Sequence, residues 1–401
     1  MKLQLTKTKT IEFALPGGGA KSASDIVGVE LFAPGFDDCA AVRLAYRKKA
    51  WHLVAAGAVK GPKGELPERW EDTPHQPTWE LPHDYTSPHA ALAVHSPMGQ
   101  FSQSTPDAVV QEMMNGLGAL PTPGSPARES GKKRFGIRRD ASAAPASTSA
   151  APLKTSLKVE TPARRPEFPR SGESVSENGR RFVVRPMAEE GFHLCASLPE
   201  FQTLWLSRLL PEGRRPTASS IQVADSALMA SVLLQPEFRA AGGSALAIFV
   251  RRDAVFFAGY KKGEGVLWRR CPSVGGSDEM RMAVKRTLGV DDELVDSVLN
   301  ESLVDPRPAL EPFVRPVLSQ LELSLAYLAS KHSLRFDHAF LMGLDAGSAH
   351  WSAYAEESLR LKLISPDPFD GLVRGKGADA PGTSRHLVAL GAAIAGSEAT
   401  L

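Results

Sequence analysis

Histidine and cysteine are the residue types in this chain that most often bind metals, yet their spacing predicts no metal site. Four histidines fall between Pro74 and Pro97, but their separations match no common ligand pattern, so zinc is kept only as a minor alternative. The three cysteines are far apart and form no Cys-x-x-Cys pair, which argues against a disulfide framework and favours a reducing compartment. The residues concerned are His75, His83, His89 and His95, with Cys39, Cys195 and Cys271. No order of serine, histidine and aspartate, and no pair of carboxylates, stands out as a hydrolytic site.

The bulk composition is that of a globular protein without a general attraction for nucleic acid. A chain of 401 residues is long enough for two or three core-forming units. Hydrophobic residues make up 42% and charged residues 23%, and the net charge of +2 gives no reason to expect a nucleic-acid partner. The first ten residues lack the apolar core of a signal peptide, and no apolar run reaches the roughly 18 to 20 residues that span a bilayer. We therefore expect a soluble, cytoplasmic protein.

The first 116 residues predict a small antiparallel meander. Residues 26–32, 40–46 and 51–59 are three apolar strand candidates in succession, and residues 89–95 are a fourth. The turn between the first two contains two aspartates, a residue type common in turns because its side chain bonds the local backbone. We interpret this region as the start of a first lobe.

The composition changes near Gly116 and again near Gly179. Residues 117–180 are rich in proline, alanine and serine and carry almost no apolar periodicity, so they cannot bury enough surface to offset their ordering entropy. We expect a disordered linker there. The basic cluster from Lys132 to Arg139 is either a solvated part of this linker or a docking site for an acidic partner or for anionic lipid headgroups.

The segment after the linker predicts strands and helices in alternation. They are residues 181–185 and 192–197 as strands, 199–210 as a helix, 219–224 as a strand and 225–233 as a helix. In the first of these helices, Phe201, Leu204 and Trp205 lie on one stripe. Core packing is the first interpretation of such a stripe, and an edge that binds a partner is the second.

The second half predicts another three-stranded meander followed by helices and one further strand. The strands are residues 242–250, 254–260, 266–270 and 339–342, and helices cover residues 280–287, 349–361 and 387–395. A long helix before the last strand carries Leu318, Leu321, Leu325 and Leu328 on one face, because these positions recur at steps of three and four.

The C-terminal block resembles the end of PilM-type proteins, which are actin-like cytoplasmic components of type IV pilus assembly platforms. The resemblance is carried by residues 335–348, the helix after them, residues 367–369 and the small-residue helix at 387–396. It implies an α/β, actin-like fold of the ribonuclease H-like class, with two lobes and a small inserted α/β subdomain. Residues 1–116 and 181–243 then form the first lobe with its insert, residues 244–380 form the second lobe, and residues 381–401 pack back on the first.

The same resemblance locates a vestigial nucleotide site. The family's Asp-x-Gly in the first phosphate hairpin corresponds to Glu30-Leu31-Phe32, and we expect the Phe32 ring to occupy the space of phosphate oxygens. The second hairpin reads Phe249-Val-Arg-Arg, with no carboxylate before Asp253. Gly275 and Gly276 match the family's glycine pair, and Ser277 is placed to cap the next helix. Of the glycine turn beneath the adenine only Gly343 and Gly347 remain, with Leu344 and Asp345 crowding the base. The predicted cofactor-binding residues are Glu30, Gly275, Gly276, Gly343 and Gly347, and no catalytic or metal-binding residue is predicted.

Two functions are consistent with this pattern. The first is a scaffold of a type IV pilus or type II secretion platform that lies at the inner-membrane face, binds the cytoplasmic tail of a PilN-like bitopic membrane protein through Phe201, Leu204 and Trp205, and does not hydrolyse ATP. The second is a working ATPase or small-molecule kinase of the same fold, with ATP and magnesium as cofactors. It would have to assemble its site from Glu30, Asp253 and Gly275.

Overall fold

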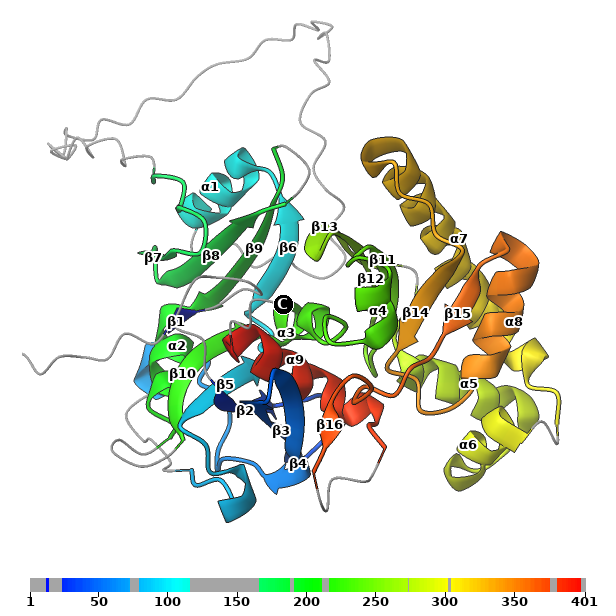
Figure 1. The fold of residues 1–401 in the computed structure, drawn as a ribbon, viewed down its shortest axis with the longest axis horizontal. Coiled ribbons are helices and arrows are strands. Elements are labelled where there is room, and N and C mark those ends of the chain that lie inside the picture. The colour runs from blue at the N-terminus through cyan, green and yellow to red at the C-terminus, as the bar shows by residue number, and fades with distance from the viewer. Residues whose placement is uncertain are drawn as a thin grey trace, which may run out of the picture.

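A computed structural model describes residues 12–13, 24–72, 79–115, 166–187, 191–210, 216–272, 274–301, 304–375 and 381–397. Three sheets organise these residues (Figure 1). Most of the predicted linker, including the basic cluster at 132–139, lies outside the described residues. In the described part of the chain, every helix is too short or too polar to cross a membrane.

The first sheet has seven strands in the order β1-β10-β5-β2-β3-β4-β16. Their bounds are Glu12–Phe13, Thr217–Val223, His89–Val94, Asp25–Leu31, Asp38–Arg47, Ala50–Lys60 and Val373–Arg374, in that order. Strands β2, β3 and β4 form the predicted antiparallel meander, which is confirmed, and the other pairings are parallel. The central strand β2 is buried at six successive positions, as expected for a strand covered on both faces.

The second sheet has five strands in the order β13-β12-β11-β14-β15. Their bounds are Glu264–Arg270, Val255–Lys261, Ala245–Val250, His338–Met342 and Lys362–Ile364. Helices α5 (Ser277–Leu288), α6 (Asp292–Glu301), α7 (Arg307–His332) and α8 (Ser348–Leu359) accompany it. The apolar side chains of these helices and of one sheet face form a core that includes Val284, Leu299, Leu321 and Trp351.

The third sheet is smaller and begins earlier in the sequence than predicted. Its order is β6-β9-β8-β7, with bounds Gln100–Ser104, His193–Pro199, Arg180–Pro186 and Ser174–Glu177, and helix α1 (Pro106–Asn115) covers it. Strand β7 lies inside the range predicted to be linker, so the expected boundary at residue 180 is wrong. The insert also takes β6 from the segment before the linker, because β6 pairs with β9 along five residues.

The remaining helices join the sheets. Helices α2 (Glu200–Ser207), α3 (Ala224–Ala230) and α4 (Pro236–Ala240) lie between the third and second sheets in the sequence. The C-terminal helix α9 (Leu387–Ser397) packs on β2, β3, β5 and α3 of the first sheet's layer (Figure 1). One buried cluster contains residues of α9, of the first sheet and of the helices that pack on that sheet. The same cluster includes Phe249, Trp268 and Met342 of the second sheet. The two lobes therefore share a continuous core.

Candidate functional site

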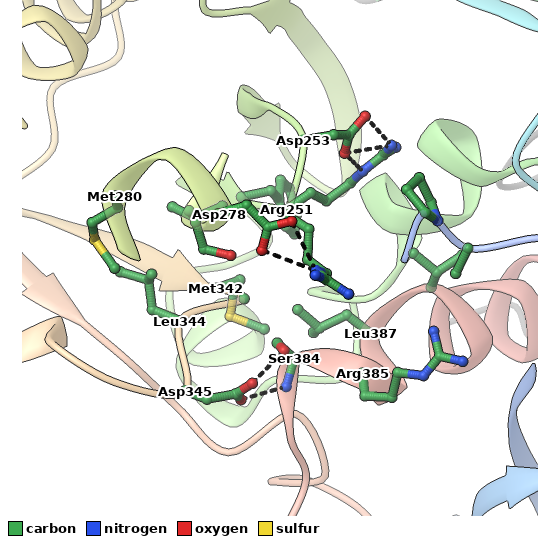
Figure 2. A pocket seen from close by; sticks show the side chains of 18 of the residues that line it. Arg251, Asp253, Asp278, Met280, Met342, Leu344, Asp345, Ser384, Arg385 and Leu387 are labelled. Atoms are coloured by element: carbon green, nitrogen blue, oxygen red, sulfur yellow. Dashed lines mark hydrogen bonds and ion pairs between the residues drawn. The ribbon is translucent and has the colours of Figure 1, made fainter. Parts of the chain in front are cut away.

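A cavity of about 390 Å³ lies between the two lobes and is lined by residues of both. Most of the lining comes from five segments: the end of β2 with the β2–β3 loop, the β11–β12 turn, the start of α5, the β14–α8 turn and the start of α9 with the residues before it. His95, Leu228 of α3 and two residues of α6 complete it. Figure 2 shows Arg251 paired with Asp253 and Asp345 bonded to Ser384, with Asp278 and Arg385 at the same cavity. We call this cavity the cleft.

Glu30 is the last residue but one of the buried strand β2 and lies beside two basic groups. Its side chain is buried, Oε1 lies 2.7 Å from Nε2 of His95, and Oε2 lies 3.7 Å from a terminal nitrogen of Arg385. The Glu30 carboxylate, which was predicted to belong to a vestigial nucleotide site, is thus engaged by the chain's own side chains.

Phe32 does not occupy the cleft, which corrects the expectation made for it. Its backbone has φ of +57°, the left-handed conformation that a glycine adopts without strain, and its ring packs 6.1 Å from the ring of Trp205. The aromatic residue of this loop that lines the cleft is Phe36.

The second hairpin places two arginines in the cleft. Arg251 forms ion pairs with Asp225 of α3 and with Asp253, whose Oδ2 lies 2.9 Å from its Nη2. Burial raises the pKa of Asp225, and the charge of Arg251 counteracts this shift. Arg252 pairs with Asp278 at 3.0 Å and donates to the carbonyl of Gly35 at 2.9 Å.

The first amides of α5 are already hydrogen-bonded. The N–H of Ser277 donates to the Arg251 carbonyl at 2.7 Å, and the N–H of Asp278 donates to the Arg252 carbonyl at 3.1 Å. Gly276 permits this approach, since a Cβ there would lie 1.9 Å from the Arg251 oxygen. Gly276, not Ser277, is the N-cap residue, and no side chain caps the helix. Free amides at a helix N-terminus bind phosphates well, and these two are not free.

The β14–α8 turn packs against the backbone of β11 and is hydrogen-bonded to the segment before α9. Gly343 has φ of +90°, and a Cβ there would lie 2.4 Å from the Val250 oxygen. Gly347 is the N-cap of α8 and donates to Asn300 at 3.2 Å. Leu344 and Asp345 line the cleft, and the Asp345 carboxylate accepts from the N–H of Ser384 at 2.7 Å.

The structure thus separates the five residues predicted to bind a cofactor. Glu30 and Gly343 line the cleft, whereas Gly275, Gly276 and Gly347 lie in neighbouring turns. These groups do not fit a magnesium triphosphate, because the Glu30 carboxylate and the first amides of α5 already have hydrogen-bond partners within the chain.

The residues predicted to bind a partner lie at the junction of the insert and the first lobe. Phe201 and Trp205 are buried, while Leu204 on the same helix is 36% exposed. The ring of Phe201 packs 5.8 Å from that of Trp70, which is 46% exposed. Core packing therefore accounts for two of the three residues.

Two important cleft residues were missed by sequence reasoning. Phe36 lies in a Pro-Gly-Phe turn with no periodicity, and Arg385 bonds Asp38 across 347 positions of sequence.

The histidines and cysteines considered as metal ligands in the sequence are a separate question from the cleft. Across the described ranges, no group of three or more histidine, cysteine or acidic side chains could hold a metal ion, and His75 lies outside them. All three cysteines are buried thiols, and burial raises the pKa of Cys39 to about 12.

Comparison with known proteins supports the fold. No protein-family model and no curated protein matches the chain. Among solved structures, the chain is similar to a PilM-PilN type IV pilus biogenesis complex, with 12% identity and a TM-score of 0.51 over 93% of this chain and 98% of that one. Further matches are a protein of unknown function with an actin-like ATPase fold from Bacteroides thetaiotaomicron (9% identity, TM-score 0.36, 86% and 91% covered) and the cytoplasmic domain of EpsL, an inner-membrane component of the type II secretion system of Vibrio cholerae (11%, 0.25, 65% and 74%). The chain therefore has the predicted actin-like α/β fold, in the form seen in PilM.

Proposed function

We propose that this protein is a scaffold of a type IV pilus or related type II secretion assembly platform, which binds a PilN-like bitopic membrane protein through that protein's cytoplasmic tail at the inner-membrane face. The similarity of its fold to the PilM-PilN complex supports the platform and the type of partner. The observation that carries the scaffold role is the cleft, where the Glu30 carboxylate and the first amides of α5 are bonded to other groups of the chain.

Three elements of the cleft argue against ATP turnover. Glu30 is paired with His95 and Arg385, the first amides of α5 are bonded to the second hairpin, and Leu344 and Asp345 fill the β14–α8 turn. Loss of one donor or positioning group at such a site costs on the order of a hundredfold in rate. Since all three are altered together, we expect negligible turnover.

Calorimetry with ATP and magnesium, together with a phosphate-release assay on the full chain, tests this part of the proposal. We expect neither binding at micromolar concentration nor phosphate release above background. Micromolar binding with turnover that Glu30→Ala abolishes would favour the alternative, an ATPase or small-molecule kinase built on Glu30, Asp253 and Gly275.

The surface beside α2 is the proposed partner site. Leu204 and Trp70 are exposed there, next to the insert, and β7 is the end strand of the third sheet. An extended chain can add to such an edge through main-chain hydrogen bonds while its side chains contact apolar neighbours.

Leu204→Asp tests the site. A charge placed in an apolar contact should weaken binding of a PilN-like tail peptide about tenfold or more, as measured by calorimetry. The matched control is Leu323→Asp on α7, because Leu323 is also an exposed leucine on a helix (55%) but belongs to the second lobe. If the two variants and the wild type bound the tail peptide with equal affinity, the partner site would lie elsewhere on the protein.

A further inference from the structure

The β2–β3 loop places one aromatic ring against two arginines from distant parts of the chain. The Cζ atom of Arg385 lies 3.7 Å from the centre of the Phe36 ring, and that of Arg252 lies 4.8 Å from it. Both distances fall within the roughly 6 Å at which a guanidinium group is attracted to a ring. Arg252 belongs to the second lobe, whereas Phe36 belongs to the first and Arg385 to the segment that leads into α9.

Further bonds hold both arginines in place. Arg385 donates to the carbonyl and carboxylate oxygens of Asp38 at 2.6 and 2.7 Å, which fixes it to the first lobe. Arg252 is held on its own lobe by Asp278 and reaches across to the carbonyl of Gly35. The Arg252 guanidinium group is therefore bonded to both lobes and connects them.

Gly35, the residue before Phe36, allows the Arg252 side chain to approach the loop closely. Gly35 has φ of +74°, and a Cβ there would lie 2.4 Å from Nη1 of Arg252. Only glycine allows both the backbone conformation and the close approach of the arginine.

We propose that Phe36, Arg252 and Arg385 form a clasp that keeps the two lobes closed over the cleft in the absence of any ligand. In this clasp Arg252 reaches from the second lobe to Phe36 and Gly35, while Arg385 holds the other side of the Phe36 ring on the first lobe. The Arg251–Asp225 pair also crosses between the lobes, beside the clasp. The inference goes beyond the proposed function, because lobe closure can be measured without a partner and without a nucleotide.

A further arginine of the cleft does not connect the two lobes. Arg281 also lines the cleft and forms an ion pair with Asp296, but both residues belong to the second lobe, on α5 and α6. Arg281 therefore provides a control for loss of an arginine from the cleft without loss of a bridge.

Distance measurement by pulsed electron paramagnetic resonance tests the clasp. Spin labels are attached at Tyr46→Cys on β3 and Leu323→Cys on α7, two exposed positions in different lobes, while the three native cysteines are buried. We expect one narrow distance distribution in the otherwise unaltered full chain. Phe36→Ala and Arg252→Ala should each raise the population with separated lobes by about 2- to 5-fold, the range that corresponds to loss of a solvent-exposed cation–ring contact. Arg281→Ala should leave the distribution unchanged.

A second pair of variants keeps the test independent of misfolding. Phe36→Leu retains the apolar bulk but removes the ring's attraction for cations, so it should open the lobes nearly as much as Phe36→Ala. Gly35→Ala should open them too, by displacing Arg252. Unchanged distributions in Phe36→Ala and Arg252→Ala, with melting temperatures near that of the parent, would overturn the proposal. Such a result would not affect the partner and nucleotide tests, because the labels report only the separation of the lobes.

Discussion

In the cleft, each arginine is matched by carboxylates from neighbouring elements. Arg251 meets Asp225 and Asp253, and Arg252 meets Asp278. Arg385 meets Asp38 and Glu30. Arginines that are neutralised in this way attract a polyanion less strongly than free ones, since a phosphate would have to displace a carboxylate that already occupies the guanidinium donors. This pairing of charges supports the proposal that the cleft does not turn over a nucleotide.

His386 should make the folded state sensitive to acid. Burial lowers the pKa of His386, and the nearby charge of Arg385 lowers it further, so the folded protein holds this side chain neutral. Above the ordinary histidine pKa of about 6.5 both folded and unfolded chains are neutral here, and no penalty arises. As the pH falls below that value, the unfolded chain binds a proton that the folded chain resists, and the free energy of unfolding decreases.

His386→Asn should remove part of this decrease. An asparagine oxygen can accept the hydrogen bond that Nδ1 of His386 accepts from the Thr383 N–H at 3.2 Å, without becoming charged. Urea unfolding at pH 7.5 and pH 5.5 should show a smaller loss of stability in the variant than in the wild type. The same substitution at the fully exposed His83 serves as the control and should leave the loss as it is. Equal losses in all three proteins would contradict the assignment.

The sequence predicted individual cleft residues where a motif existed and failed where contacts were long-range. Glu30 and Gly343 could be found because each lies at or next to the end of an apolar strand, at a position with a counterpart in a known fold. Phe36 could not, since a single aromatic residue in a turn carries no periodic signal. Arg385 could not because its partners, Glu30 and Asp38, are brought to it only when α9 folds back on the first sheet.

Among the elements, the buried strands were the easiest to predict. Strands β2, β5, β11 and β14 are short apolar runs bounded by polar or glycine residues. The bounds of β2, β5 and β14 were predicted to within one residue, whereas β11 was predicted to begin three residues too early. Strands β6 and β7 were missed, because Gln-Phe-Ser-Gln-Ser and Ser-Val-Ser-Glu carry one apolar residue each and none of their positions is fully buried. Their pairing comes from the insert as a whole, whose other strands supply the apolar surface.

The contact between β2 and α9 depends on small residues on both elements. A Cβ at Gly28 would lie 2.0 Å from the Ala389 oxygen and 2.5 Å from the Ala393 nitrogen, both in the helix backbone. Helix backbone cannot move aside as a side chain can. Gly28→Ala should therefore lower the free energy of unfolding by about 3 kcal/mol, the upper end of the usual cost of overpacking.

Gly57→Ala is the matched control, since Gly57 is also a strand glycine of the first sheet. The nearest atom to its added Cβ is the hydroxyl of Tyr85 at 3.1 Å, the end of a side chain. Its cost should stay below about 1 kcal/mol, within the range of ordinary surface or partly buried changes. Denaturant unfolding of both variants measures the difference, and similar costs would show that α9 can shift along β2.

At the scale of the whole molecule, Trp268 joins the second lobe to the insert. It lies on β13 and packs on Phe256 and Phe249 of its own sheet, while Phe101 of β6 contacts it at 5.1 Å. Its N–H in the backbone donates to the side chain of Gln103 on the same strand β6. This cluster therefore links the insert to the second lobe, in addition to the core that the two lobes share.

Trp268→Ala should consequently disturb both parts of the molecule. Removal of a buried tryptophan costs about 3 to 5 kcal/mol, and hydrogen exchange measured by mass spectrometry should speed up in β6 as well as in β12 and β13. The control is Trp351→Ala, because Trp351 is fully buried within the second lobe, against Phe313 and Met280. Its destabilisation should be similar in size, but the additional exchange should concentrate in α5, α7 and α8. Faster exchange in β6 in both variants, or in neither, would mean that Trp268 does not link the insert to the second lobe.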